Sequence, residues 1–364
     1  MFRLPLSRRS VWQALAFSSA VVVLLIAAEG LLMLPIILDT PLPMIAVRHC
    51  VLRGTDAPAL SVLRVFCQSE ASPIKYVLAR HELSANPQAR VVLAGIDPIS
   101  AFDCATDELV VISGGAEFGS IYTLNLLETP PKPRLLGRQT DGDPISVVIS
   151  PDRRWLASHA CQAVYLWDLH ERRLKWRRDV EAGCVAFAPR LDRLVCGLID
   201  GRVVEMSLQD GQIRATIAIH RAPVKCLAID PHGERLASAG EYERLIVSDF
   251  HRRRPLWSTS GTSAHTMQFS PSGEVLFTSP VELPLGRGDS RVELRNARTG
   301  GLIGKLGRDE ERTHGGVFLN DHTVCTWGGD GAIRIWDARE QTLLKVVRPT
   351  LTMTAIDELW PDYQ

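Results

Sequence analysis

The sequence predicts an all-β fold, a seven-bladed β-propeller of four-stranded antiparallel blades, preceded by one N-terminal transmembrane helix. Two observations predict it: a degenerate unit that recurs seven times, and nineteen uncharged residues, 10–28, near the N-terminus. In each unit a short apolar strand leads into a polar turn, a second strand, a Gly/Asp turn and a third strand. The clearest copies run from Val147 to Leu169 and from Leu227 to Phe250.

The first turn of each unit marks the period of the repeat. The markers are spaced by 47, 38, 42, 40, 49 and 38 residues, and they are Cys104, Pro151, Pro189, Pro231, Pro271, Asn320 and Glu358. A period near 40 residues, with about four short strands per unit, is typical of a propeller.

A propeller must join its first and last blades, because open sheet edges invite pairing with other chains. Leu351–Asp357 aligns with an innermost strand, and no further strand follows it before the C-terminus. Three strands are expected at the other end of the domain, at Leu60–Cys67, Ile74–Arg80 and Arg90–Ala94. The propeller is therefore predicted at 59–364, its last blade shared between 59–95 and 350–358. Met44–Leu52 competes for one of these strands.

The third strand of several units ends in a recurring dipeptide. It is intact at Trp167-Asp168 and Trp336-Asp337, and worn to Ser248-Asp249 and Arg295-Asn296. With this dipeptide in register, residues 59–364 resemble the WD-repeat β-propeller family. The resemblance implies a non-catalytic scaffold that binds peptides or domains across its top rim and central opening.

The same resemblance implies a hydrogen-bond network that stabilises the blades. In the best-matching repeat its members are His314, Thr326, Asp330 and Trp336. A second copy keeps Ser158 and Trp167, with Gln162 at the Asp position, and a third keeps His220 and Ser238. Such a chain lets a buried indole N–H and a buried carboxylate satisfy each other.

Ser10–Ala28 is long enough to span a bilayer, because nineteen residues make a helix of about 28 Å. Arg3, Arg8 and Arg9 precede it, and the next basic residue is Arg48. The positive-inside rule then predicts a cytoplasmic tail at 1–9, an anchor at 10–34, a linker at 35–58 and an extracytoplasmic propeller. The alternative is a signal peptide cut after Ala28, which would release a secreted or periplasmic binding or sensor protein.

Charge and cysteine content exclude two classes of function. The chain has 41 basic and 41 acidic residues, which argues against bulk nucleic-acid binding. Its eight cysteines form no CxxC and no Cys/His cluster, so no metal site is expected. We expect buried thiols, and disulfides stay possible in an oxidising compartment.

No catalytic motif or phosphate-binding loop occurs, so neither an enzyme nor a cofactor is predicted. A propeller enzyme with charged residues in its channel stays an alternative, because fold alone does not exclude it. The long connection at 280–290 is the candidate binding loop, since surplus loop length on a rigid scaffold often carries binding. Its candidate residues are Pro280, Glu282, Arg287 and Asp289.

A second candidate surface is basic. Its residues lie near predicted turns at one face of the propeller, and they are Arg153, Arg154, Arg172, Arg173, Arg177, Arg178, Arg252, Arg253 and Arg254. This face is predicted to attract anionic lipid headgroups or an acidic protein, at about 1 kcal/mol per basic residue near a membrane. The alternative is a set of ordinary solvated arginines.

Overall fold

The computed structural model describes fifteen stretches of the chain: 45–52, 61–68, 75–82, 89–95, 99–106, 108–114, 119–160, 162–189, 193–241, 244–260, 264–280, 291–307, 313–328, 330 and 332–348. The chain divides into a unit of residues Met1–Leu42 and a unit of residues Pro43–Gln364, and all of the described residues belong to the second. The predicted tail and anchor, 1–34, lie outside them.

The described strands form seven four-stranded antiparallel sheets, each made of four consecutive strands. The first sheets comprise β1 (Ile45–Leu52), β2 (Ser61–Gln68), β3 (Lys75–Glu82) and β4 (Ala89–Gly95); β5 (Ile99–Thr106), β6 (Leu109–Gly114), β7 (Ser120–Leu124) and β8 (Arg134–Arg138); and β9 (Ser146–Ile149), β10 (Trp155–His159), β11 (Val164–Asp168) and β12 (Arg173–Arg178). This confirms the all-β prediction and the four-stranded repeat.

The remaining sheets follow the same order along the chain. They comprise β13 (Ala182–Phe187), β14 (Arg193–Leu198), β15 (Arg202–Ser207) and β16 (Ile213–Ile219); β17 (Val224–Ile229), β18 (Arg235–Gly240), β19 (Arg244–Asp249) and β20 (Arg254–Ser260); β21 (Ala264–Phe269), β22 (Val275–Pro280), β23 (Val292–Asn296) and β24 (Leu302–Leu306); and β25 (Thr313–Asn320), β26 (Thr323–Gly328), β27 (Ile333–Asp337) and β28 (Thr342–Val347).

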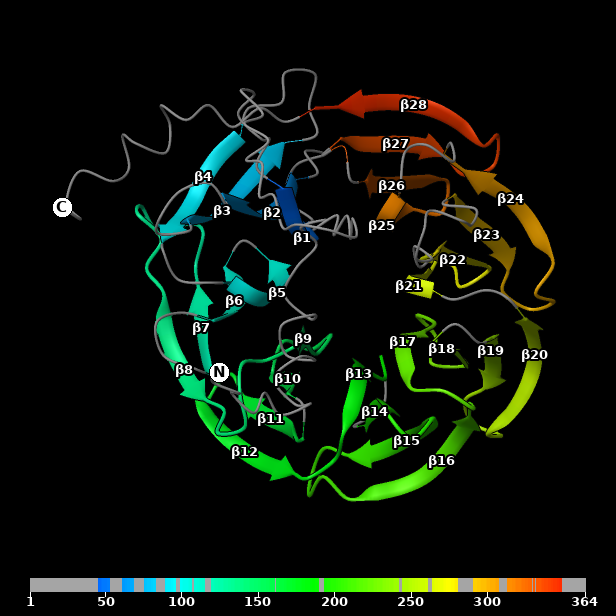
Figure 1. Cartoon of the computed structure of the whole chain (residues 1–364), viewed down its shortest axis with the longest axis horizontal. Helices are drawn as coiled ribbons and strands as arrows, with labels where there is room; N and C mark the ends of the chain where they lie inside the picture. Colours follow the sequence, from blue (N-terminus) through cyan, green and yellow to red (C-terminus); the bar gives the residue numbers. More distant parts are fainter. Residues whose placement is uncertain are drawn as a thin grey trace, which may run out of the picture. The chain divides into compact units, whose positions relative to one another are not determined.

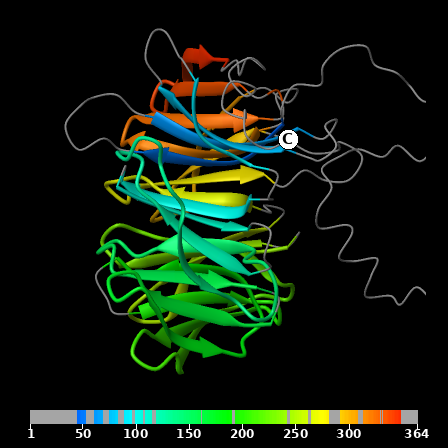
Figure 2. The same ribbon diagram turned by 90° about the vertical axis from the view of Figure 1, so that its left-hand side faces the viewer.

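Within the second unit the sheets follow one another around a common axis (Figure 1). The first strand of each sheet lies nearest the axis and the fourth lies at the outer rim. In the view turned by 90° the strands run between two faces, and the connections lie along these faces (Figure 2). Functional side chains on connections are therefore displayed at the two faces, held by a rigid scaffold.

The hydrophobic core lies between neighbouring sheets, because the middle strands of each sheet are covered on both sides. All residues of β10 and β11 are buried, whereas the first three residues of β12 are exposed. One cluster joins Trp155 and Leu166 to Val185 and Leu194 of the next sheet. Burial of a Leu or Val side chain is worth about 1.5–3 kcal/mol, so such layers are the main source of stability.

The β1–β4 sheet differs from the predicted shared blade. Its innermost strand is β1, which pairs with β2 at the position expected for Leu351–Asp357. Residues 45–52 compete successfully because their sequence, IAVRHCVL, is equally apolar and directly precedes β2. Residues 351–364 lie outside the described part of the chain, and the sheet holding residues 61–95 is complete without them.

A β-bulge recurs at the second residue of the innermost strands. The pairing shifts register between Ala182 and Cys184, between Val224 and Cys226, and at the same place in β5, β21 and β25. Bulges bend a strand and re-aim one residue, so each of these strands carries one extra residue near its start.

Within the part of the chain that the structure describes, we find no helix with the length and hydropathy of a membrane span.

Candidate functional site

The predicted blade network is present in two sheets as a bond between an indole and a hydroxyl group. The Trp336 Nε1–H donates to Thr326 Oγ1 at 2.8 Å, and the Trp167 Nε1–H donates to Ser158 Oγ at 2.9 Å. All four side chains are buried. Ser158 also accepts a bond from Gln139 Nε2, a residue that the sequence did not point to.

The backbone register changes the predicted role of His314. In the β17–β20 sheet the network histidine is His220, which lies before the inner strand and contacts Ser238 Oγ at 2.8 Å through Nε2. His314 instead lies in the bulge of β25, at the position that Lys225 has in β17. Asp330 accepts bonds from Arg334 Nη1 and Nη2 at 3.1 and 2.6 Å.

The predicted basic face is smaller than expected. Arg153 and Arg154 lie in the β9–β10 turn, and Arg172 and Arg173 lie at the β11–β12 turn, as predicted. Arg177 and Arg178 end β12, where Arg178 pairs with Val164 at the opposite end of β11. The prediction is wrong for these two arginines because they lie at the end of the six-residue strand β12 that is farther from the turn.

Most of the remaining arginines are paired with acidic groups. Arg173 contacts Glu171 at 2.5 Å, and Arg252 contacts Asp249 at 3.0 Å. Arg154 lies 3.8 Å from Asp168 and stacks over Trp155. These neighbours neutralise much of the predicted patch, because an adjacent carboxylate cancels the attraction for an external anion.

Two arginines of this set contact the preceding sheet. Arg172 has a φ of 50° and donates from Nη2 to the Leu135 carbonyl of β8 at 3.0 Å. Arg253 has a φ of 54° and lies 3.6 Å from the buried carboxylate of Glu205 in β15. Gln341 makes an equivalent contact: it has a φ of 55°, and its side chain donates to the Ile303 carbonyl at 3.2 Å. The left-handed backbone directs each side chain back to the preceding sheet.

At the two sheet boundaries that lie between these contacts, a tryptophan packs on a glycine of the next sheet. Trp176 of β12 donates to the Leu208 carbonyl at 2.9 Å and packs on Gly211, whose φ is 69°. A Cβ at Gly211 would lie 2.9 Å from Trp176 Cδ2, so this close approach requires glycine. Trp257 donates to the Ala297 carbonyl at 3.0 Å and packs on Gly300 in the same way.

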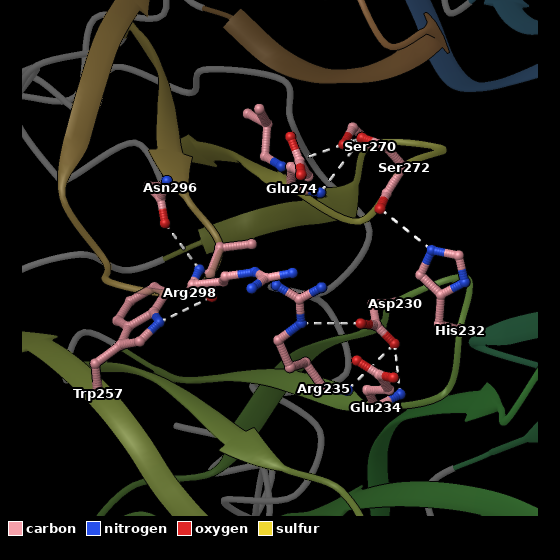
Figure 3. Close-up of polar contacts among 12 residues, drawn as sticks. Asp230, His232, Glu234, Arg235, Trp257, Ser270, Ser272, Glu274, Asn296 and Arg298 are labelled. Carbon is pink, nitrogen blue, oxygen red and sulfur yellow. Dashed lines mark hydrogen bonds and ion pairs between the residues drawn. The ribbon is translucent and has the colours of Figure 1, made fainter.

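A polar cluster links the turns of three neighbouring sheets, and Figure 3 shows it from Asp230 to Ser272. The Asp230 carboxylate accepts bonds from Glu234 N at 2.7 Å and from Arg235 Nε at 2.9 Å. Both partners of the ion pair are buried, with side chains 0% and 8% exposed.

The same cluster continues around the ring. His232 Nε2 lies 3.2 Å from the Ser272 carbonyl oxygen (Figure 3). The Ser272 N–H donates to Asp321 at 2.7 Å. Hydrogen bonds from the side chain and the backbone N–H of Ser272 lower the pKa of Asp321. The cluster therefore links the turns that precede β18, β22 and β26 by hydrogen bonds.

Asp103 provides a further link between sheets. Its carboxylate accepts bonds from its neighbour Cys104 N at 2.8 Å and from Ile149 N of the next sheet at 2.7 Å. Burial raises the pKa of Asp103 to about 6, although both hydrogen bonds oppose that shift. Asp103 therefore joins two inner strands, β5 and β9.

The cysteines fall into two groups. Cys104 is disulfide-bonded, whereas Cys184, Cys196, Cys226 and Cys325 are not. Burial raises the pKa of Cys226 to about 12, so its thiol is unreactive at neutral pH. The expectation of buried thiols is confirmed for Cys196, Cys226 and Cys325, whereas Cys184 is partly exposed. Cys104 matches the alternative expectation of a disulfide. Among the described residues no group of three potential metal ligands occurs.

The candidate binding loop lies almost wholly outside the described residues. Pro280 belongs to β22, where it pairs with Ala264. Residues 281–290, which include Glu282, Arg287 and Asp289, stay a prediction.

Known proteins with similar sequences share the repeat. The family model described as "WD domain, G-beta repeat" matches residues 211–246, which hold the end of the β13–β16 sheet and the start of the β17–β20 sheet. The human angio-associated migratory cell protein is 24% identical over 169 residues, 46% of this chain. The chain spans only 37% of the length of that relative.

Solved structures extend the likeness to the whole fold. Chaetomium thermophilum Sqt1, bound to the N-terminus of ribosomal protein L10, has a TM-score of 0.63 at 14% identity and covers 84% of this chain and 88% of its own. The computationally designed Ika8 protein has a TM-score of 0.62 at 15% identity, covering 85% and 88%. At this identity the likeness concerns the fold, which is propeller-like and contains a WD40 repeat.

Proposed function

We propose that this protein is a membrane-anchored propeller that acts as a non-catalytic scaffold for a protein or peptide partner. The observation that carries the proposal is the ring of sheets itself. Five of its sheet boundaries are joined by the Arg172, Arg253 and Gln341 contacts and by the Trp176 and Trp257 contacts, which hold a rigid surface. A preformed surface binds with little ordering cost. The L10-bound Sqt1 structure supports a partner of this kind.

Two features support an extracytoplasmic propeller. Arg3, Arg8 and Arg9 precede the uncharged stretch, which favours a cytoplasmic N-terminus. Cys104 is disulfide-bonded, and disulfides persist in oxidising compartments rather than in the cytosol.

The loop at 281–290 is the proposed contact for the partner. Its sequence is VELPLGRGDS, and it makes the connection between β22 and β23 the longest between a second and a third strand among the described sheets. The loop carries charges of both signs, at Glu282, Arg287 and Asp289. Such charges would orient a bound partner as well as add affinity.

Affinity capture from detergent-solubilised membranes tests this role. We expect the full-length chain to retain a partner that is lost when residues 281–290 are replaced by a two-residue Asn-Gly turn. The matched control changes Arg153, Arg173 and Arg254 to serine, which alters exposed turns without touching the loop. Equal capture by the loop-shortened and unaltered chains would contradict the assignment of the loop.

A further inference from the structure

The outer rim of the ring carries exposed aliphatic side chains that are unevenly distributed. Ten such residues lie on the described outer strands β8, β12, β16, β20, β24 and β28, and five of them lie on β24 and β28 alone. These five, here called the apolar rim, are Leu302, Ile303, Leu343, Leu344 and Val346, with exposed fractions between 38% and 58%.

A hydrogen bond joins the two strands of the apolar rim across the boundary between their sheets. Gln341, which directly precedes β28, donates to the Ile303 carbonyl of β24 at 3.2 Å. Leu343 and Leu344 follow within three residues of that contact. Figure 1 shows β24 and β28 as neighbouring arcs of the outer edge. Exposed aliphatic residues grouped on neighbouring strands, unlike singly scattered ones, point to an interaction site.

Two other outer strands carry charged residues or proline beside their exposed aliphatic side chain. β12 exposes Arg173 and Lys175 beside its single exposed Leu174, and β20 carries Pro255 beside Leu256. Charged residues and proline are common devices that keep an edge strand from associating. The sequence of β28, TLLKVV, contains one charge.

The charges that border the apolar rim are mostly basic. Residues 338–348 carry Arg339, Lys345 and Arg348 against Glu340 as the single acid. Aliphatic side chains next to basic ones suit the headgroup region of a bilayer, where the chains enter the apolar layer and the cations meet phosphate.

The covalent tether limits the distance between ring and bilayer. Ten residues, 35–44, separate the predicted anchor from the start of β1 at Ile45. Fully extended, they span at most about 36 Å. The tether enters the ring at β1, the innermost strand of the sheet that stands next to the β25–β28 sheet (Figure 1).

We infer that the apolar rim of β24 and β28 docks on the lipid bilayer that holds the anchor, so that the ring rests on the membrane by its edge. The inference rests on the proposed membrane-anchored function. Docking of this kind would leave both faces of the ring accessible to a partner.

Lipid quenching of a site-specific fluorophore tests the docking. The full-length chain carrying Leu344→Cys is labelled with an environment-sensitive maleimide dye and placed in lipid nanodiscs at one copy per disc. The matched control is Ile219→Cys on β16, which is 64% exposed and lies across the ring from β28. Unaltered chain, labelled in parallel, corrects for the native cysteines.

We expect brominated lipid to quench the dye at position 344 several-fold more strongly than at position 219. In a second pair, Ile303→Cys carries the dye, and adding Leu344→Glu should abolish quenching while the urea midpoint is kept. Equally weak quenching at 344 and 219 would overturn the inference and leave the anchor intact. A dependence on two copies per disc would also overturn it, in favour of a second copy as the occupant. A mature N-terminus near Glu29 would remove the anchor, and with it both proposals.

Discussion

Replacing Trp176 by alanine is expected to lower the free energy of unfolding by about 3–5 kcal/mol, the usual cost of removing a large buried aromatic side chain. Trp176 is buried in the cluster that joins the β9–β12 and β13–β16 sheets. Its loss would also leave the Leu208 carbonyl without the indole donor that now lies 2.9 Å away. The measurement is the urea midpoint of the full-length chain in detergent micelles, followed by tryptophan fluorescence.

Trp176→Phe separates packing from hydrogen bonding in the same site. It keeps the ring over Gly211 and removes the N–H, so we expect a loss of about 1 kcal/mol. Trp257→Ala, at the equivalent position of β20, should cost less than Trp176→Ala because Trp257 is only partly buried. An unchanged midpoint for Trp176→Ala would show that this sheet boundary does not depend on the indole.

Replacing Asp230 by alanine is expected to destabilise the chain by about 3–5 kcal/mol, because it leaves a buried charge without its partner. Arg235 is almost fully buried and donates from Nε to Asp230 at 2.9 Å. The same change removes the acceptor for two backbone N–H groups, those of Glu234 and Arg235. The urea midpoint again provides the measurement.

The neighbouring sheet offers a matched control for this prediction. Its equivalent turn has Ser270, whose Oγ accepts the Val275 N–H at 3.1 Å. The double variant Asp230→Ser with Arg235→Val copies that turn, so we expect it to recover most of the lost stability. If the double variant is as unstable as Asp230→Ala, the unpaired charge is not the cause of the loss.

The repeat and the strand order could be predicted from the sequence because they depend on local patterns. Apolar alternation and polar turns recur near every 40 residues, and each sheet consists of consecutive strands. The pairs Trp167–Ser158 and Trp336–Thr326 could be predicted for the same reason, since each lies within one repeat.

Closure of the ring and the role of His314 depend on register, which local patterns specify weakly. Two segments of similar composition, 45–52 and 351–357, could both supply an inner strand, and the structure uses the first beside β2. His314 was assigned by residue type, although the bulge in β25 moves it to the position of Lys225. One added residue is enough to change which face a side chain occupies.

The basic face was predicted from turn positions without the partners of each arginine. Glu205 lies in the middle of β15, so nothing near Arg253 in the sequence announces their contact. The sequence does carry a signal for the contacts between sheets, because Arg172 and Trp176 recur 81 residues later as Arg253 and Trp257. A spacing of two repeats indicates contacts that alternate between sheet boundaries.

Protease accessibility of the full-length chain in sealed membrane vesicles of known orientation tests the membrane-anchored propeller most directly. With the extracytoplasmic side outward, we expect added protease to digest the ring while a tag placed before Arg3 stays protected and membrane-bound after alkaline extraction. Digestion of the tag with protection of the ring, or release of the whole chain at alkaline pH, would contradict the account.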